Sequence, residues 1–321
     1  MTLDPEIAKF HRYLVDAFAA YPQFETLPPV EARRIMEELR APLARGGPVM
    51  AATLNLTVTI DDMPVAVRLH VPTAAPGPAP ALVPALVYLH GGGWVLFSME
   101  THDRIMREYA AHAGVVVAGV EYALAPEARF PTALRQIVGV LRWLYAHAAE
   151  FGIDRERLAV GGDSVGANLA MASALSLRDA GEGNIVKALV LNYGVYDADF
   201  DRRSYRKYGS ADKILTRSEM ISFWNHYIAA EQDLHNPLAC LARADVAGLP
   251  PAFLVIAEQD PLFDENIAMG DQLSAAGVPV KSVVYPGTTH SFLEAVSMAE
   301  VSRRALADAG DWLRRTLGAA G

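Results

Sequence analysis

Apolar runs and helical periodicities alternate along most of this chain. Short segments that are almost wholly apolar predict buried strands, and segments with apolar residues at spacings of three and four predict helices between them. The expected strands span residues 85–89, 115–120, 158–160, 186–191, 252–257 and 280–285. The expected helices span residues 101–113, 132–148, 164–179, 264–276 and 299–317. This alternation predicts an α/β fold with a mostly parallel central sheet flanked by helices.

The first part of the chain follows a different pattern. Residues 5–18 and 30–39 have the spacing of amphipathic helices and precede every expected strand. Residues 53–60 and 65–71 alternate β-branched and polar positions around a short polar turn, which predicts an antiparallel hairpin. The proline-rich stretch 72–84 then predicts a surface loop, because an apolar strand follows it at once.

The alternation stops again at residues 196–236. This stretch is polar, rich in Arg and Tyr, and helical in pattern only at 217–228. We therefore expect a helical cap over the sheet, made of an N-terminal segment (1–50) and a second segment (196–236). The core is then divided into residues 51–195 and 237–321.

Composition and charge narrow the class of protein. The chain has 321 residues, 52% of them hydrophobic, which is enough for a sizeable core. Its net charge of −9 and the lack of a basic stretch argue against a nucleic-acid partner. The absence of an apolar run of about 18 residues argues against a membrane partner. The N-terminus lacks a signal-peptide pattern, and the single Cys240 allows no intrachain disulfide, so a cytoplasmic protein is expected.

The strongest chemical signal is the G-x-S-x-G pattern at residues 162–166. It lies between the expected strand 158–160 and the expected helix 164–179, the context in which such a serine is exposed on a sharp, strained turn. We therefore interpret Ser164 as a nucleophile.

Three glycines follow His90 directly after the strand 85–89. Backbone amides in such a loop can converge on the oxyanion that acyl transfer to a serine generates. A phosphate-binding loop is the alternative, but neither a following Lys-Ser/Thr pair nor a G-x-G-x-x-G pattern is present.

Two later loops contain the candidate acid and base. Asp260 follows the strand 252–257 and is favoured over Glu258, which is close to the strand end, and over Asp264, which is expected to cap the next helix. His290 follows the last strand, and the chain order Ser164, Asp260, His290 is the one found in α/β-hydrolases. No metal site is expected, because no H-E-x-x-H pattern occurs and His102 and His112 lie on different faces of one helix.

Several segments together resemble the bacterial hormone-sensitive-lipase-like (family IV) carboxylesterases, closest to their acetyl esterase branch. These segments are HGGGW and THDRIMR, EYALAPEARFP, GDSVGANLA, ASALSLRD, DPLFDE and YPGTTHSF. The resemblance implies an α/β-hydrolase core with a helical cap, no cofactor, and hydrolysis of short-chain esters. It also implies that Ser164, Asp260 and His290 form the catalytic triad. The amides of Gly91, Gly92 and Val165 are implied as oxyanion donors.

The expected activity is hydrolysis of small-molecule esters with acetyl to butyryl acyl groups through an acyl-enzyme. Phe97 and Val165 stand where the family usually has glycine and alanine, and together with Trp94 they are expected to shorten the acyl pocket. An amidase, a lactonase or a carbamate hydrolase would use the same triad, and a non-catalytic small-molecule receptor could share the fold. The chain is expected to be a monomer or a homodimer, with the strand 280–285 as a possible edge for pairing.

Overall fold

The computed structural model describes residues 2–73 and 82–318. The strands are β1 (Ala52–Ile60), β2 (Met63–Val71), β3 (Val83–Leu89), β4 (Val116–Glu121), β5 (Ile153–Asp163), β6 (Ala188–Asn192), β7 (Ala252–Gln259) and β8 (Val280–Thr289). They form one sheet in the order β1-β2-β4-β3-β5-β6-β7-β8. β2 pairs antiparallel with both β1 and β4, and every pair from β4 to β8 is parallel. The predicted hairpin and the mostly parallel sheet are thus confirmed.

Helices connect the parallel strands and extend the chain at its beginning. The α-helices are α1 (Pro5–Phe18), α2 (Pro29–Arg40), α3 (Asp103–Ala113), α4 (Thr132–His147), α5 (Val165–Asp179), α6 (Arg203–Tyr208), α7 (Arg217–Tyr227), α8 (Phe263–Ala275) and α9 (Glu300–Leu317). The 3-10 helices are η1 (Phe24–Thr26), η2 (Ala148–Phe151), η3 (Glu231–His235), η4 (Leu241–Arg243) and η5 (Phe292–Ser297).

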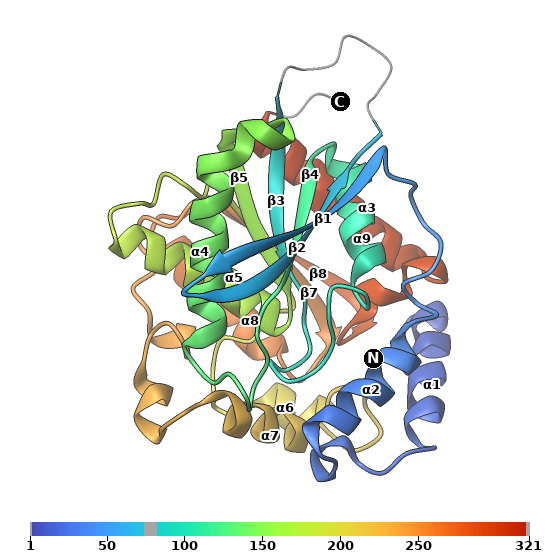
Figure 1. Ribbon diagram of the computed structural model, residues 1–321. Helices are drawn as coiled ribbons and strands as arrows, with labels where there is room; N and C mark the ends of the chain where they lie inside the picture. Colours follow the sequence, from blue (N-terminus) through green and yellow to red (C-terminus); the bar gives the residue numbers. More distant parts are fainter. Residues whose placement is uncertain (1, 74–81, 319–321) are drawn as a thin grey trace.

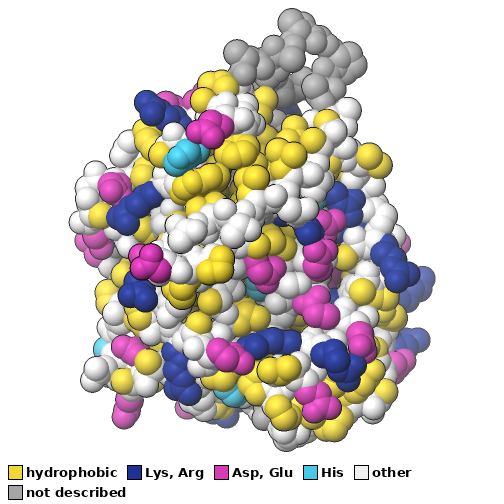
Figure 2. Space-filling model, viewed as in Figure 1, with side chains coloured by type: hydrophobic (Ala, Val, Ile, Leu, Met, Phe, Trp, Pro, Cys, Tyr) yellow, Lys and Arg dark blue, Asp and Glu magenta, His cyan; other side chains and the backbone are white. Residues whose placement is uncertain are grey.

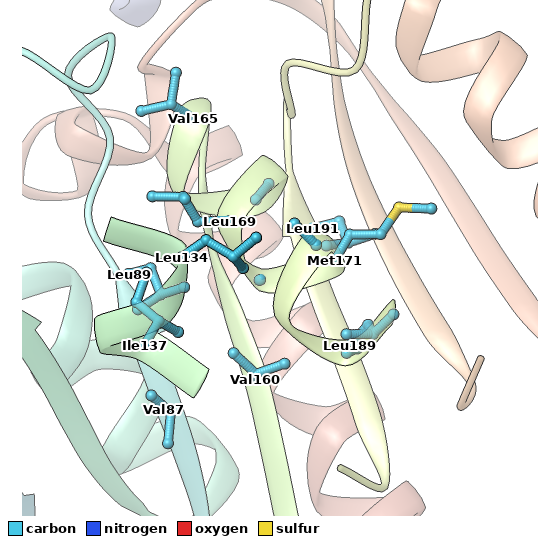
Figure 3. Packing of buried hydrophobic residues seen from close by; sticks show 14 of the residues in the cluster. Val87, Leu89, Leu134, Ile137, Val160, Val165, Leu169, Met171, Leu189 and Leu191 are labelled. Carbon is cyan, nitrogen blue, oxygen red and sulfur yellow. The ribbon is translucent and has the colours of Figure 1, made fainter. Parts of the chain in front are cut away.

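The central strands of the sheet are buried on both faces, as their continuous apolar sequences require, whereas the edge strands β1 and β8 are exposed along much of their length. Along β3, Val87 and Leu89 point into a cluster shared with α4 and α5, whereas Leu86 and Tyr88 point into a cluster shared with α3 and α9. Figure 1 shows α4 and α5 on one side of the sheet and α3 and α9 on the other. The first cluster is seen from close by in Figure 3.

Element boundaries differ from the prediction where polar residues hide the pattern. β5 begins at Ile153 rather than at residue 158. The pattern of apolar residues missed this first part of the strand, because residues 154–157 are polar and at least partly exposed. Asp264 does not cap α8: Leu262 occupies the N-cap position, and the Asp264 carboxylate accepts a hydrogen bond from the Ser204 amide (2.8 Å). Most of the loop expected at 72–84, residues 74–81, lies outside the described part of the chain.

The helices α1, α2, α6 and α7 lie together at one end of the molecule (Figure 1). Side chains of α1, α2 and α7 face a cavity that also contains the residues following β5 and β8. These helices therefore cover the carboxyl ends of the parallel strands. Basic and acidic side chains are interspersed over the face shown in Figure 2.

Candidate active site

Ser164 sits on a strained turn between β5 and α5. Its backbone has φ 55° and ψ −120°, a conformation that L-residues rarely adopt. A side chain on Gly162 or Gly166 would overlap the Leu89 carbonyl oxygen at the end of β3, so the turn requires both glycines. Hydrogen bonds from the Ser164 amide to Asn192 (2.9 Å) and from the Val195 amide to Ser164 (3.2 Å) hold this conformation.

The structure brings Ser164, Asp260 and His290 into one hydrogen-bonded chain. Nδ1 of His290 lies 2.8 Å from Oδ2 of Asp260, and Nε2 lies 3.1 Å from Oγ of Ser164. A carboxylate can only accept, so Nδ1 carries the proton and Nε2 accepts from the Ser164 hydroxyl. Asp260 is itself oriented by the Leu262 amide, which donates to Oδ1 (2.9 Å). Tyr193 packs against the His290 imidazole in an edge-to-face arrangement, with a centroid distance of 5.1 Å.

The sequence predicts Gly91 and Gly92 as the glycines at the site, whereas Gly92 and Gly93 are the ones that line the cavity. Gly92 and Gly93 line the cavity with φ values of 112° and 62°, and a side chain on Gly92 would overlap the Leu96 carbonyl oxygen. Gly91 does not line it: its amide nitrogen lies 3.4 Å from Nε2 of His102, beneath the loop. Val165 begins α5, where the first amides of a helix have no intrahelical acceptor.

His102 and Asp163 form a buried pair beneath this loop that sequence reasoning missed. Thr101 Oγ1 donates its one proton to the Ser98 carbonyl (2.9 Å), so Nδ1 of His102 must donate to Thr101 (2.9 Å). Nε2 of His102 lies 3.2 Å from Oδ2 of Asp163, whose other oxygen accepts from the Tyr88 hydroxyl (2.8 Å). These contacts pair His102 with the Asp163 carboxylate, and the Gly91 amide is also directed at Nε2 (3.4 Å).

The electrostatics of the pair agree with this assignment. Burial by itself lowers the pKa of His102, but the charge and hydrogen bond of Asp163 outweigh it and the net shift is upward. Burial by itself raises the pKa of Asp163. The charge of His102 and the hydrogen bonds from His102 and Tyr88 outweigh this effect, so the pKa of Asp163 is lowered overall. In the sequence, His102 stands out only as a candidate metal ligand and as part of the THDRIMR segment, and nothing there indicates the pairing with Asp163.

A cavity lies at Ser164 and is also lined by His290, Gly92 and Gly93. Of the residues expected to shape it, Phe97 lines the cavity, whereas Trp94 and the Val165 side chain do not. Trp94 stacks on Tyr227 with a centroid distance of 4.1 Å, and Val165 belongs to the buried cluster of Figure 3.

Arg40 of α2 is a second buried charge at this cavity. Its Nη1 donates to Oε2 of Glu294 (2.8 Å), and both side chains are at most 4% exposed. Its guanidinium also lies over the rings of Phe97 (5.0 Å) and Phe18 (5.7 Å). The pair joins the N-terminal helices to η5, which follows His290.

Within residues 2–73 and 82–318, no three His, Cys, Asp or Glu side chains are grouped so that they could hold a metal ion. None of the helices in those same ranges is both long and apolar enough to cross a bilayer.

Comparisons with known proteins agree with this fold and site. Residues 86–294 match a family model described as the alpha/beta hydrolase fold. The acetyl esterase of Salmonella paratyphi B is 40% identical over 234 residues, which is 72% of each chain. The crystal structure of an α/β-hydrolase enzyme from the metagenome of Lake Arreo superimposes with a TM-score of 0.92 at 31% identity, over 99% of both chains.

A second solved structure extends the comparison to a hyperthermophilic esterase from the archaeon Pyrobaculum calidifontis. It superimposes with a TM-score of 0.90 at 31% identity, over 98% of this chain and 99% of that one. The family match covers well over half of the chain, and the similar proteins include an acetyl esterase and a hyperthermophilic esterase. The protein therefore belongs to the α/β-hydrolase fold family, among its hormone-sensitive-lipase-like carboxylic ester hydrolases.

Proposed function

We propose that the protein is a serine carboxylesterase that hydrolyses small-molecule esters with short acyl groups, from acetyl to butyryl. The observation that carries this proposal is the chain of hydrogen bonds from Ser164 through His290 to Asp260, with the serine at the wall of a cavity. The 40% identity to an acetyl esterase supports the same substrate class.

The mechanism follows from the direction of these hydrogen bonds. His290 Nε2 takes the proton from Ser164 as Oγ attacks the ester carbonyl, and Asp260 orients and stabilises the imidazolium that forms. His290 then returns the proton to the leaving alcohol, and an acyl-enzyme remains on Ser164. Water attacks this acyl group by the same route and releases the carboxylic acid.

The oxyanion of each tetrahedral intermediate is held by backbone amides. We assign Gly92, Gly93 and Val165 to this role, because both glycines line the cavity and Val165 opens α5 beside the nucleophile. Gly93 takes the place expected for Gly91, whose amide faces His102. Each donor is worth about 10²–10³-fold in rate.

The N-terminal segment (1–50) and the second segment (196–236) act together as a cap in this proposal. Phe18 and Met36 reach the cavity from the first segment, and Met220 and Phe223 reach it from the second. With Phe97 they make an apolar enclosure that fits a short aliphatic chain and excludes water from the acyl-enzyme.

Replacing the nucleophile tests the proposal. Ser164→Ala should lower kcat/KM for p-nitrophenyl acetate to near the uncatalysed background and abolish labelling by a fluorophosphonate, with an unchanged circular dichroism spectrum. Wild-type protein that fails to hydrolyse the ester or to react with the fluorophosphonate would contradict the assignment and favour a receptor. Matched amide, lactone and carbamate substrates, measured with the same preparation, decide between the other hydrolase activities.

A further inference from the structure

A second cavity lies next to the catalytic one. Its walls come from α2, from the segment that precedes α2, from the glycine loop and from α7. The two cavities have three wall residues in common, Leu96, Glu219 and Phe223. These three residues therefore form the partition between the space at Ser164 and the second cavity.

Within the partition, the Phe223 ring rests on the glycine loop. A Cβ atom built on Gly93 would overlap three atoms of this ring, so the ring packs against the Gly93 backbone. The absence of a side chain at Gly93 is thus what lets Phe223 close the wall beside the proposed oxyanion site.

The other two partition residues, Leu96 and Glu219, each form a hydrogen bond within the loop or helix that contains them. The Leu96 amide donates to the Gly92 carbonyl (2.8 Å) in the tight turn of the loop. The Glu219 carboxylate completes the capping box of α7 by accepting from the Thr216 amide (2.8 Å). Phe223 contributes only an apolar ring, so its truncation opens the wall without removing a hydrogen bond.

We propose that Phe223 sets the upper limit on acyl-chain length, and that the second cavity is the space a longer chain occupies once the ring is removed. This inference rests on the proposed esterase function. The second cavity is lined largely by apolar side chains, among them Phe24, Leu27 and Ala32, and so fits an unbranched aliphatic chain. Phe223 is then a specificity-determining residue.

The test compares kcat/KM for p-nitrophenyl acetate, butyrate and octanoate in wild type and Phe223→Ala. Each methylene that leaves water is worth about fourfold in binding. With four additional methylenes, the octanoate-to-butyrate ratio should rise by at least about tenfold. The ratio is the readout, because a variant that disturbs the glycine loop lowers the rates for all chain lengths together.

Two companion variants locate the added chain. Leu27 lines only the second cavity and is partly exposed, so Leu27→Trp should fill that cavity and return the ratio of the double variant toward wild type. Phe200→Ala removes an equally large, partly buried ring that lines a different cavity, and it should leave the ratio unchanged. Phe223→Leu retains an apolar contact with Gly93 and replaces Phe223→Ala if the latter does not fold.

Three results would overturn the inference. The first is an unchanged ratio in a folded Phe223 variant that still hydrolyses the acetate. The second is a raised ratio that Leu27→Trp does not reverse. The third is a gain confined to longer alcohol groups in an acetate series. Wild-type protein inactive on every ester would instead refute the proposed function itself.

Discussion

The buried ion pair between Arg40 and Glu294 makes a quantitative prediction about stability. Each side chain is at most 4% exposed, and one hydrogen bond of 2.8 Å joins them. Arg40→Met keeps an unbranched apolar stem but leaves the Glu294 carboxylate buried without its cation. Removing one partner of a buried pair in this way costs about 3–5 kcal/mol of unfolding free energy.

The corresponding change in melting temperature follows from the size of the chain. Globular proteins gain about 2.1 cal/mol/K of entropy per residue on unfolding, or about 0.7 kcal/mol/K for 321 residues. We therefore expect Arg40→Met to lower Tm by about 4–7 °C. Thermal denaturation followed by circular dichroism measures this shift directly.

Two further variants separate the pair from general damage to α2. The double variant Arg40→Met/Glu294→Leu removes both charges, so it should be within about 1 kcal/mol of wild type or more stable. Arg34 lies on the same helix and pairs with Glu38 at 2.7 Å, but both are more than half exposed, so Arg34→Met should cost about 0.5 kcal/mol or less. A double variant as unstable as Arg40→Met, or an Arg40→Met variant as stable as Arg34→Met, would refute the reasoning.

Two other predictions concern the candidate triad and a buried carboxyl group. Asp260→Asn should lower kcat for p-nitrophenyl acetate by about 10⁴-fold, because the amide no longer fixes the His290 tautomer; a loss below about tenfold would argue against the triad. Burial raises the pKa of Glu265 from 4.5 to about 8. The folded state therefore holds this proton more tightly than the unfolded chain, and stability falls as pH rises from about 4.5 to about 8. Glu265→Gln should flatten that part of the Tm-against-pH curve, and an identical slope in the variant would contradict the assignment.

Much of the fold could be predicted because local patterns report burial. A strand buried on both faces must be apolar throughout, and this made β3, β4, β6 and β7 visible in the sequence. The start of β5 was not visible, because residues 154–157 are polar and its length depends on a neighbouring strand. Backbone hydrogen bonding at the end of a sheet does not require a particular residue type, so it cannot be predicted from the residues alone.

The grouping of Ser164, Asp260 and His290 could also be predicted. Parallel strands end at one edge of a sheet, so loops after β5, β7 and β8 must lie near one another whatever their distance along the chain. The residues that line the cavity around them could not be assigned in the same way. Which residues of the loop face the cavity depends on packing against α7: Trp94 stacks on Tyr227, whereas the Phe223 ring packs against Gly93.

The sequence by itself determined the order of strands and helices, the strand–turn–helix at Ser164 and the loops that bring Asp260 and His290 to it, since each depends on local spacing and on the geometry of a parallel sheet. Only the tertiary structure decided the pairing of His102 with Asp163, the Arg40–Glu294 pair and the contact of Phe223 with Gly93. Arg40 and Glu294 are 254 positions apart. A partner so far away in sequence is chosen by packing, because the cost of burying a charge is offset only by the group that the folded chain places beside it.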